Sequence, residues 1–183
     1  IEIAPLDDKA ELQKASALTD TNEKVEVLKK FVASFPDSSL MPQASELLSS
    51  TAYTAGDEHL AANDVVSAIP FYKLAVDAAP KPVPEKLFND SLAKIPAELY
   101  WHGSRPEAVD LAKALEAKVS DNANQLAAMA MFHATIEDGE GAVRVAEMAT
   151  KVDSASAKAF RTLGTAYRVN FQLEESAAAY AKA

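Results

Sequence analysis

The sequence predicts an all-α protein built from antiparallel helix hairpins that repeat along the chain. Alanine is abundant among its 183 residues while glycine occurs only 5 times, and glycine costs a helix about 1 kcal/mol relative to alanine. Apolar residues recur at spacings of three and four, which is the period of a helix. Side chains of the same size class return with a period of about 34 residues over the second half of the chain, which is typical of a repeat architecture.

Charge and composition exclude several classes of function. The 27 acidic residues outnumber the 18 basic ones and give a net charge of -9, so a nucleic acid partner is not expected. No run of about 20 apolar residues is present, so direct membrane insertion is not expected either. The chain has no cysteine, which excludes disulfides and thiolate chemistry. It begins at Ile1 rather than Met, as expected for a processed precursor, an excised domain or a trimmed chain.

The N-terminal part, residues 1–48, is expected to hold a helical pair and the start of the first repeat. Apolar residues at helical spacing predict helices over 6–18 and 25–35. Pro36 cannot continue a helix, so the second helix should end there. A long helix is expected to begin near Leu40.

Four copies of one size pattern organise the rest of the chain. The clearest copy has large residues, a small residue and an aromatic on one helix, and small and aromatic residues on the next: Phe160, Leu163, Gly164 and Tyr167, then Ser176, Tyr180 and Ala183. Two further copies precede it at the same period, and a slightly longer step back along the chain reaches the first copy. The predicted repeats are 49–82, 89–122, 123–156 and a truncated 157–183, in a single continuous solenoid.

Proline and glycine mark the expected breaks between helices. Three prolines within 80–86 predict a stiff spacer that bends the stack. Pro70 and Pro96 are each expected in the first turn of a helix that starts late, because an interior proline costs about 3 kcal/mol. Ser104, followed by a proline and a glutamate, predicts a capping box. Gly139 and Gly141 predict a tight turn between two helices.

The size pattern over residues 49–183 resembles the tetratricopeptide repeat. The resemblance implies a right-handed α-solenoid whose first helices line a concave groove that holds another polypeptide, and it implies no cofactor. The physical basis is steric. Small residues such as Gly56, Ala130 and Gly164 let the two helices of a hairpin approach closely, and Tyr72 or Tyr167 fills the space between adjacent hairpins.

No arrangement of reactive side chains predicts catalysis or a metal site. His59 and His133 occupy the slot that the repeat reserves for an aromatic packing residue, and His102 is expected at a helix end, where a cation favours the terminal carbonyls. The acidic pairs 57–58, 137–138 and 174–175 are neighbours in sequence, so on a helix their side chains point in different directions. Phosphate loops, nucleophile elbows and calcium loops are also missing. We therefore expect a protein that is not an enzyme and has no catalytic or metal-binding residues.

The resemblance also indicates where a partner would bind, on first-helix positions that are not used for packing. Transferred by spacing, these positions are Tyr53, Asp57, Tyr100, Trp101, Asn124, Ala127, Met131, Lys158, Arg161, Thr165 and Arg168. Lys158, Arg161 and Arg168 are spaced by three and seven residues, so they form one basic stripe on an otherwise acidic protein. The stripe predicts contact with an acidic segment, and Tyr100 with Trp101 predicts contact with apolar side chains.

The leading functional hypothesis is a scaffold that binds a protein or peptide segment without catalysis. One alternative is a regulatory or targeting module of a larger multidomain enzyme or envelope complex. Another is a peptide-binding or glycan-binding helical array with a pocket near Tyr53, Tyr100 and Trp101. The incomplete repeat at 157–183 leaves an apolar edge, which is expected to attract further repeats, another domain or a second subunit by self-association.

The repeat junction in 31–53 resembles those of bacterial cell-envelope proteins of the same superfamily. It contains Phe31, Phe35, Pro36, Ser38, Ala44, Leu47 and Tyr53. This resemblance favours the bacterial periplasm or cell envelope over the cytoplasm.

Overall fold

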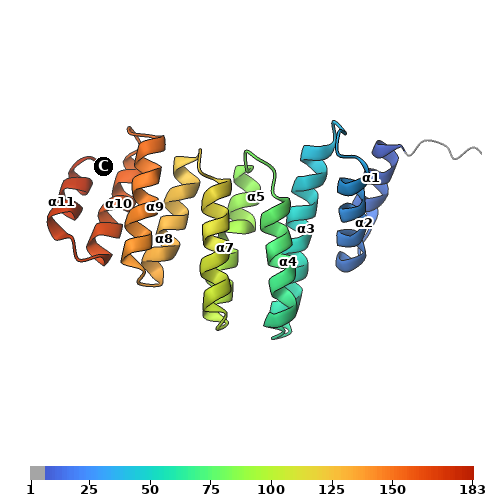
Figure 1. The fold of residues 1–183 in the computed structure, drawn as a ribbon, viewed down its shortest axis with the longest axis horizontal. Coiled ribbons are helices and arrows are strands. Elements are labelled where there is room, and N and C mark those ends of the chain that lie inside the picture. The colour runs from blue at the N-terminus through green and yellow to red at the C-terminus, as the bar shows by residue number, and fades with distance from the viewer. Residues whose placement is uncertain (1–6) are drawn as a thin grey trace, which may run out of the picture. The chain divides into compact units, whose positions relative to one another are not determined.

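Every regular element in the described part of the chain is a helix. The computed structural model describes residues 7–183, which contain eleven α-helices, one short 3-10 helix and no strand (Figure 1). They form two compact units, unit 1 up to Pro80 and unit 2 from Lys81, and each is described by itself. The predicted all-α class is confirmed.

Unit 1 contains four helices, and aspartates begin three of them. These helices are α1 (Asp8–Ala17), α2 (Thr21–Ser34), α3 (Met41–Ala61) and α4 (Val65–Ala78). The carboxylates of Asp7, Asp20 and Asp64 accept hydrogen bonds from backbone N–H groups in the first turns of α1, α2 and α4, which satisfies donors that a helix start leaves unpaired. The predicted N-terminal pair and the long helix after Leu40 are confirmed. Leu6, where the first was expected to begin, lies outside the described residues.

The α3–α4 hairpin closes on a glycine. A Cβ atom added to Gly56 would lie 2.7 Å from the ring of Tyr72, which is 0% exposed. The Tyr72 hydroxyl donates to Asp57 at 3.2 Å, and the Ser49 hydroxyl donates to the carbonyl of Ala75 at 2.6 Å. The ring of Tyr72 therefore occupies the space that any larger side chain at position 56 would need.

Unit 2 contains three helix hairpins after a short helical entry. Its elements are α5 (Glu85–Asp90), the 3-10 helix η1 (Leu92–Lys94), α6 (Ile95–Trp101), α7 (Arg105–Lys118), α8 (Ala123–Thr135), α9 (Gly139–Val152), α10 (Ala157–Val169) and α11 (Leu173–Ala181). The pairs α6–α7, α8–α9 and α10–α11 are the hairpins, and Figure 1 shows α7 to α11 side by side in chain order. Fully buried alanines such as Ala112, Ala146 and Ala149 let these helices pack closely.

The turns between paired helices repeat with the predicted period. Gly103, Glu137 and Phe171 adopt left-handed backbone conformations, with φ of 90°, 62° and 60°. They are evenly spaced along the chain, one in each of the three hairpins of unit 2. Asn63, with φ of 59°, occupies the same place between α3 and α4. The backbone therefore repeats in the same register as the side-chain pattern.

The last hairpin uses the same close approach as the α3–α4 hairpin. A Cβ atom on Gly164 would lie 2.9 Å from the ring of Tyr180. The Ser176 hydroxyl donates to the carbonyl of Gly164 at 2.7 Å, and the hydroxyls of Tyr180 and Thr165 lie 2.9 Å apart. The predicted role of small residues inside a hairpin is confirmed at both glycines.

Of the two prolines expected in the first turn of a helix, only one lies there. Pro96 lies in the first turn of α6, as predicted. Pro70 lies inside α4, so its predicted late start is wrong. Asp64 caps α4 through the N–H of Ser67 at 3.1 Å, which fixes the helix start upstream of the proline. Pro70 is exposed.

Two further predictions about helix ends are wrong. Ser104 precedes α7 but its side chain makes no capping hydrogen bond, so the predicted capping box does not form. Gly139 and Gly141 belong to the first turn of α9 rather than to the loop before it. The carboxylate of Asp138 caps that helix by accepting from the N–H of Gly141 at 3.0 Å.

The segment predicted as a spacer, 80–86, spans the boundary between the units, and α5 begins within it. The arrangement of all copies as one continuous solenoid stays a prediction.

Candidate protein-binding surface

The predicted basic stripe lies on α10. Lys158, Arg161 and Arg168 are all exposed, and none of the described carboxylates lies within 4.0 Å of their charged groups. Thr165 lies between them in sequence and is partly buried, and its hydroxyl donates to the carbonyl of Arg161 at 3.1 Å and lies 2.9 Å from the hydroxyl of Tyr180. Three cations on α10 are thus available to a partner's carboxylates.

The aromatic pair lies at the end of α6. Trp101 is 66% exposed, whereas Tyr100 is half-buried. The two rings meet edge to face with centroids 5.2 Å apart. The Arg105 guanidinium lies 5.1 Å from the centre of the Tyr100 ring, and the ring of Phe132 lies 6.5 Å from it. Tyr100 therefore contacts three neighbouring side chains, while the indole of Trp101 stays largely exposed.

On α8, Met131 is 41% exposed and Asn124 is also exposed. Asn124 lies in the first turn, where its backbone N–H donates to Asn122 at 3.1 Å. Ala127, expected on the same surface, is buried at 1% exposure, so that expectation is wrong. Helices α8 and α10 pack against each other directly, which brings their exposed residues onto neighbouring elements.

Eight of the predicted residues therefore belong to the first helices of the three hairpins in unit 2, and we call them the first-helix surface. They are Tyr100, Trp101, Asn124, Met131, Lys158, Arg161, Thr165 and Arg168. The other two, Tyr53 and Asp57, lie on α3 in unit 1. The Tyr53 ring lies 5.9 Å from that of Tyr72, and Asp57 accepts the hydrogen bond from the same tyrosine.

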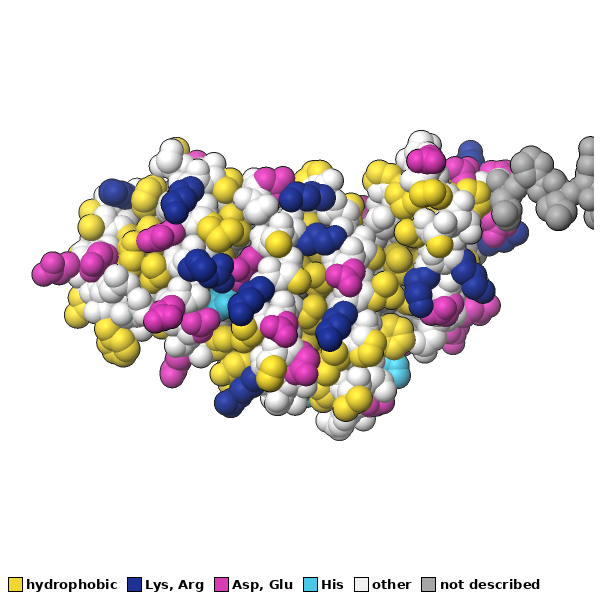
Figure 2. All heavy atoms as spheres, viewed as in Figure 1, with side chains coloured by type: hydrophobic (Ala, Val, Ile, Leu, Met, Phe, Trp, Pro, Cys, Tyr) yellow, Lys and Arg dark blue, Asp and Glu magenta, His cyan; other side chains and the backbone are white. Residues whose placement is uncertain are grey.

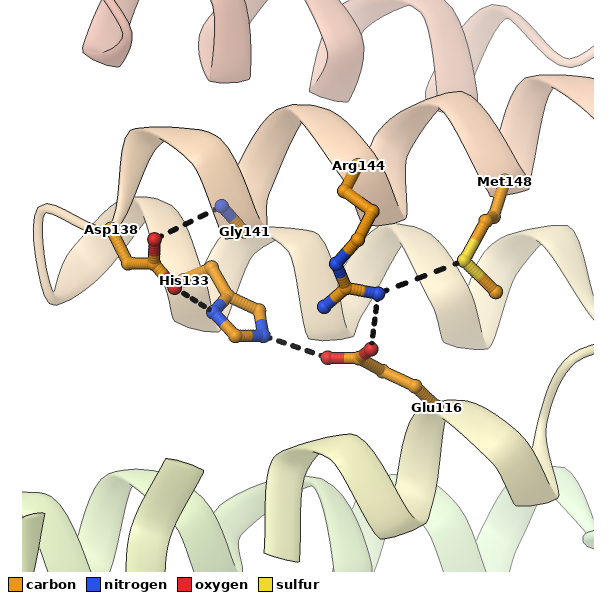
Figure 3. Close-up of polar contacts among 6 residues, drawn as sticks. All are labelled: Glu116, His133, Asp138, Gly141, Arg144 and Met148. Atoms are coloured by element: carbon orange, nitrogen blue, oxygen red, sulfur yellow. Dashed lines mark hydrogen bonds and ion pairs between the residues drawn. The ribbon is translucent and has the colours of Figure 1, made fainter. Parts of the chain in front are cut away.

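A buried polar cluster in unit 2 is the feature that the sequence did not reveal. His133 on α8 is 1% exposed. Its Nε2 atom lies 2.7 Å from Glu116 on α7, and its Nδ1 atom lies 2.7 Å from Asp138. Figure 3 shows the imidazole between these two carboxylates, with Arg144 of α9 on the other oxygen of Glu116 at 2.7 Å.

Both carboxylates in the cluster are held in their charged form. Burial by itself raises the pKa of Glu116, but hydrogen bonds from His133 and Arg144 outweigh it and lower that pKa below the ordinary value. Burial also opposes ionisation of Asp138, whose pKa is nevertheless lowered by the N–H of Gly141 and by His133.

The cluster joins two hairpins rather than forming a reactive site. Glu116 belongs to the α6–α7 hairpin, while His133 and Arg144 belong to the α8–α9 hairpin. Helices α7 and α8 approach each other over a shorter stretch than α8 and α9 do, and the polar contacts of Glu116 lie at this junction. The imidazole itself is buried. A sequence signal existed only for Asp138, five residues after the histidine.

A second polar contact joins the following pair of hairpins. The hydroxyl of Tyr167 on α10 donates to Glu147 on α9 at 3.0 Å. Burial raises the pKa of Tyr167, and the bond to Glu147 raises it further. Tyr167 thus lies between hairpins, as the repeat pattern predicts.

The described residues also limit the alternatives. Among residues 7–183, no group of three or more histidine, aspartate or glutamate side chains could hold a metal ion. None of the described helices is both long and apolar enough to span a bilayer. On the face drawn in Figure 2, basic and acidic side chains of unit 2 alternate with apolar ones.

Comparison with known proteins supports the fold. No protein-family model matches the chain, and no curated protein matches its sequence. The solved structure of the MamA RS-1 ArsTM double mutant aligns with a TM-score of 0.50 at 13% identity, covering 96% of this chain and 91% of that one. MamA 41-end from Desulfovibrio magneticus RS-1 aligns at 0.49 and 13% identity, covering 96% and 92%.

YrrB, a TPR protein with an unusual peptide-binding site, aligns with a TM-score of 0.48 at 18% identity, covering 96% of this chain and 84% of its own. At such identities the likeness concerns the fold alone. With its hairpins in register at the predicted period, the chain has the antiparallel helix-hairpin repeat fold of the tetratricopeptide type.

Proposed function

We propose that the protein is a non-catalytic scaffold that binds a polypeptide segment along the first-helix surface of unit 2. One observation carries the proposal: a large exposed aromatic, Trp101, lies on the same set of helices as three cations without carboxylate partners among the described residues. Exposed aromatic and arginine side chains are the residues that most often anchor protein interfaces.

The chemistry of the surface suggests the character of the partner. Lys158, Arg161 and Arg168 would contact acidic side chains or a carboxylate terminus, because arginine pairs with carboxylates through two parallel hydrogen bonds. Trp101 and Met131 would contact apolar side chains of the same segment. Tyr53 and Asp57 remain candidate contacts of unit 1.

Crosslinking from single positions tests this proposal. A photoreactive benzoylphenylalanine replaces Met131 in one variant and Lys113, exposed on the second helix α7, in a matched control. We expect irradiation in an extract of the source cells to give a discrete protein adduct at position 131 and none at 113. Equal adducts at the two positions, or none at either, would contradict the proposal.

Glycan binding is a second candidate because Trp101 is exposed and held edge to face against Tyr100. Trp101 is the chain's only tryptophan, so its fluorescence reports directly on that site. A shift on titration with oligosaccharides would favour a glycan, and an unchanged spectrum would exclude it.

The remaining expectations stay proposals. A location in the bacterial cell envelope rests on the junction resemblance over 31–53, and fractionation of source cells with an antibody to the chain tests it. The mass of the natural product distinguishes a separate scaffold from a regulatory or targeting module of a larger enzyme or complex.

A further inference from the structure

Phe171, in the turn between α10 and α11, is both conformationally strained and exposed. Its φ of 60° lies in the left-handed region, which bulky side chains rarely adopt. The side chain is 90% exposed, and no described aromatic ring or cation lies against it. Neither the backbone conformation nor the environment of Phe171 therefore stabilises unit 2.

The exposure is a property of this turn position in every hairpin. Asn63, Gly103 and Glu137 occupy the equivalent position, and all three are exposed although further helices follow them. A Cβ atom on Gly103 would meet nothing within 4 Å. Asparagine and glycine adopt the left-handed conformation readily, whereas phenylalanine adopts it rarely. The aromatic at position 171 therefore needs a reason outside the fold.

Unit 1 contains a hollow whose lining includes two phenylalanine side chains. It has a volume of about 240 Å³ and lies between α1 and α2, lined by Glu11, Val27, Lys30, Phe31, Ser34 and Phe35. The rings of Phe31 and Phe35 are 4.9 Å apart. An apolar cavity of about 150 Å³ accepts benzene, so the hollow can accept the benzyl group of a phenylalanine.

The charges around the two features are complementary. Lys30, at the rim of the hollow, is exposed and has no described carboxylate within 4.0 Å, while Glu11 is already paired with Lys14 at 2.6 Å. On the other side, Glu174 and Glu175 follow Phe171 in the first turn of α11, and both are exposed. These acidic residues would approach Lys30 if Phe171 entered the hollow.

We propose that Phe171 anchors a head-to-tail contact between two copies of this chain, by inserting into the α1–α2 hollow of the second copy. The contact joins two different surfaces, so it can continue to further copies. It is small, and its expected affinity is accordingly weak. It is separate from the first-helix surface and does not depend on the proposed polypeptide binding.

Sedimentation equilibrium of the full chain over a wide concentration range tests the contact. The average mass should rise above 19.5 kDa with concentration. Phe171→Asn, which installs the residue that unit 1 has at this turn position, should weaken association by about 30-fold, as for an interface anchor. Its melting temperature should not fall, because the strain is relieved. The matched control Lys158→Ala with Arg161→Ala should associate like the wild type.

A charge exchange separates the proposed contact from other modes of association. Lys30→Glu alone, and Glu174→Lys with Glu175→Lys alone, should each remain monomeric. Mixed together they should associate again, because the altered hollow attracts the altered turn and the unaltered hollow attracts the unaltered turn.

Three results would overturn the proposal. The first is a wild type that stays monomeric at all concentrations, and the second is undiminished association of Phe171→Asn. The third is binding of a monomeric wild type to phosphatidylcholine vesicles through Phe171, which would assign this side chain to a lipid surface.

Discussion

Both His133 and Arg144 contact the buried carboxylate of Glu116. Glu116→Gln keeps the shape of the side chain but leaves the guanidinium of Arg144 without its charge partner and the imidazole of His133 without its carboxylate contact. We expect the free energy of unfolding to fall by about 3 kcal/mol, as when one partner of a buried pair is removed. Chemical denaturation measures the loss. Asp110→Asn, exposed on the same helix, should change stability by no more than about 0.5 kcal/mol.

The same cluster makes the free energy of unfolding depend on pH in the acidic range. The folded-state pKa values of Glu116 and Asp138 are lowered, so their contribution is present above the unfolded pKa values and is lost as pH falls through the folded ones. The free energy of unfolding should therefore decrease below about pH 4.5. Denaturation midpoints measured at a series of pH values should show a shallower acid dependence in Glu116→Gln than in Asp110→Asn. Parallel curves for the two variants would contradict this assignment.

The α3–α4 hairpin depends on the absence of a side chain at Gly56. Gly56→Leu on α3 would place carbon atoms where the buried ring of Tyr72 lies. Overpacking of this kind costs about 1–3 kcal/mol, and we expect that loss in denaturation experiments on the full chain. Ala61→Leu, at an exposed position near the end of the same helix, is the control. Equal stability of the two variants would show that the α3–α4 hairpin does not depend on close approach.

The first helix of the 89–122 copy shows how one residue alters an element. The repeat pattern expects a small residue at position 96, and the chain has proline there. Proline cannot donate a hydrogen bond to residue 92 and its ring excludes the helical path of the preceding turn. The helix is accordingly interrupted: η1 ends at Lys94 and α6 begins at Ile95. The copy keeps its register, since Gly103 still occupies the turn position.

For the whole chain, the sequence predicted the features that depend on size and period. The helical class and the glycine contacts at positions 56 and 164 follow from a pattern that each copy repeats. The end of α2 before Pro36 and the start of α3 after Leu40 follow from local signals close to them in sequence. The same periodicity placed Trp101 and the α10 cations on exposed positions.

What the sequence could not predict depends on contacts between elements. Glu116 and His133 are 17 residues apart, and their pairing requires the packing of α7 against α8. The failed capping box at Ser104 and the early start of α4 depend on which of several competing hydrogen bonds forms. Ala127 had the right spacing for the binding surface, but burial by neighbouring residues is not visible in spacing.

The central claim is that exposed cations and aromatics on the first helices of unit 2 bind a polypeptide. Its most direct test is the affinity of the crosslinked partner, measured by calorimetry at several salt concentrations. Arg161→Ala with Arg168→Ala should weaken binding by about 10-fold to 100-fold and reduce its salt dependence. Lys113→Ala with Lys151→Ala, which removes equal charge from the second helices α7 and α9, should have a much smaller effect. Equal affinities of the two double variants at every salt concentration would contradict the claim.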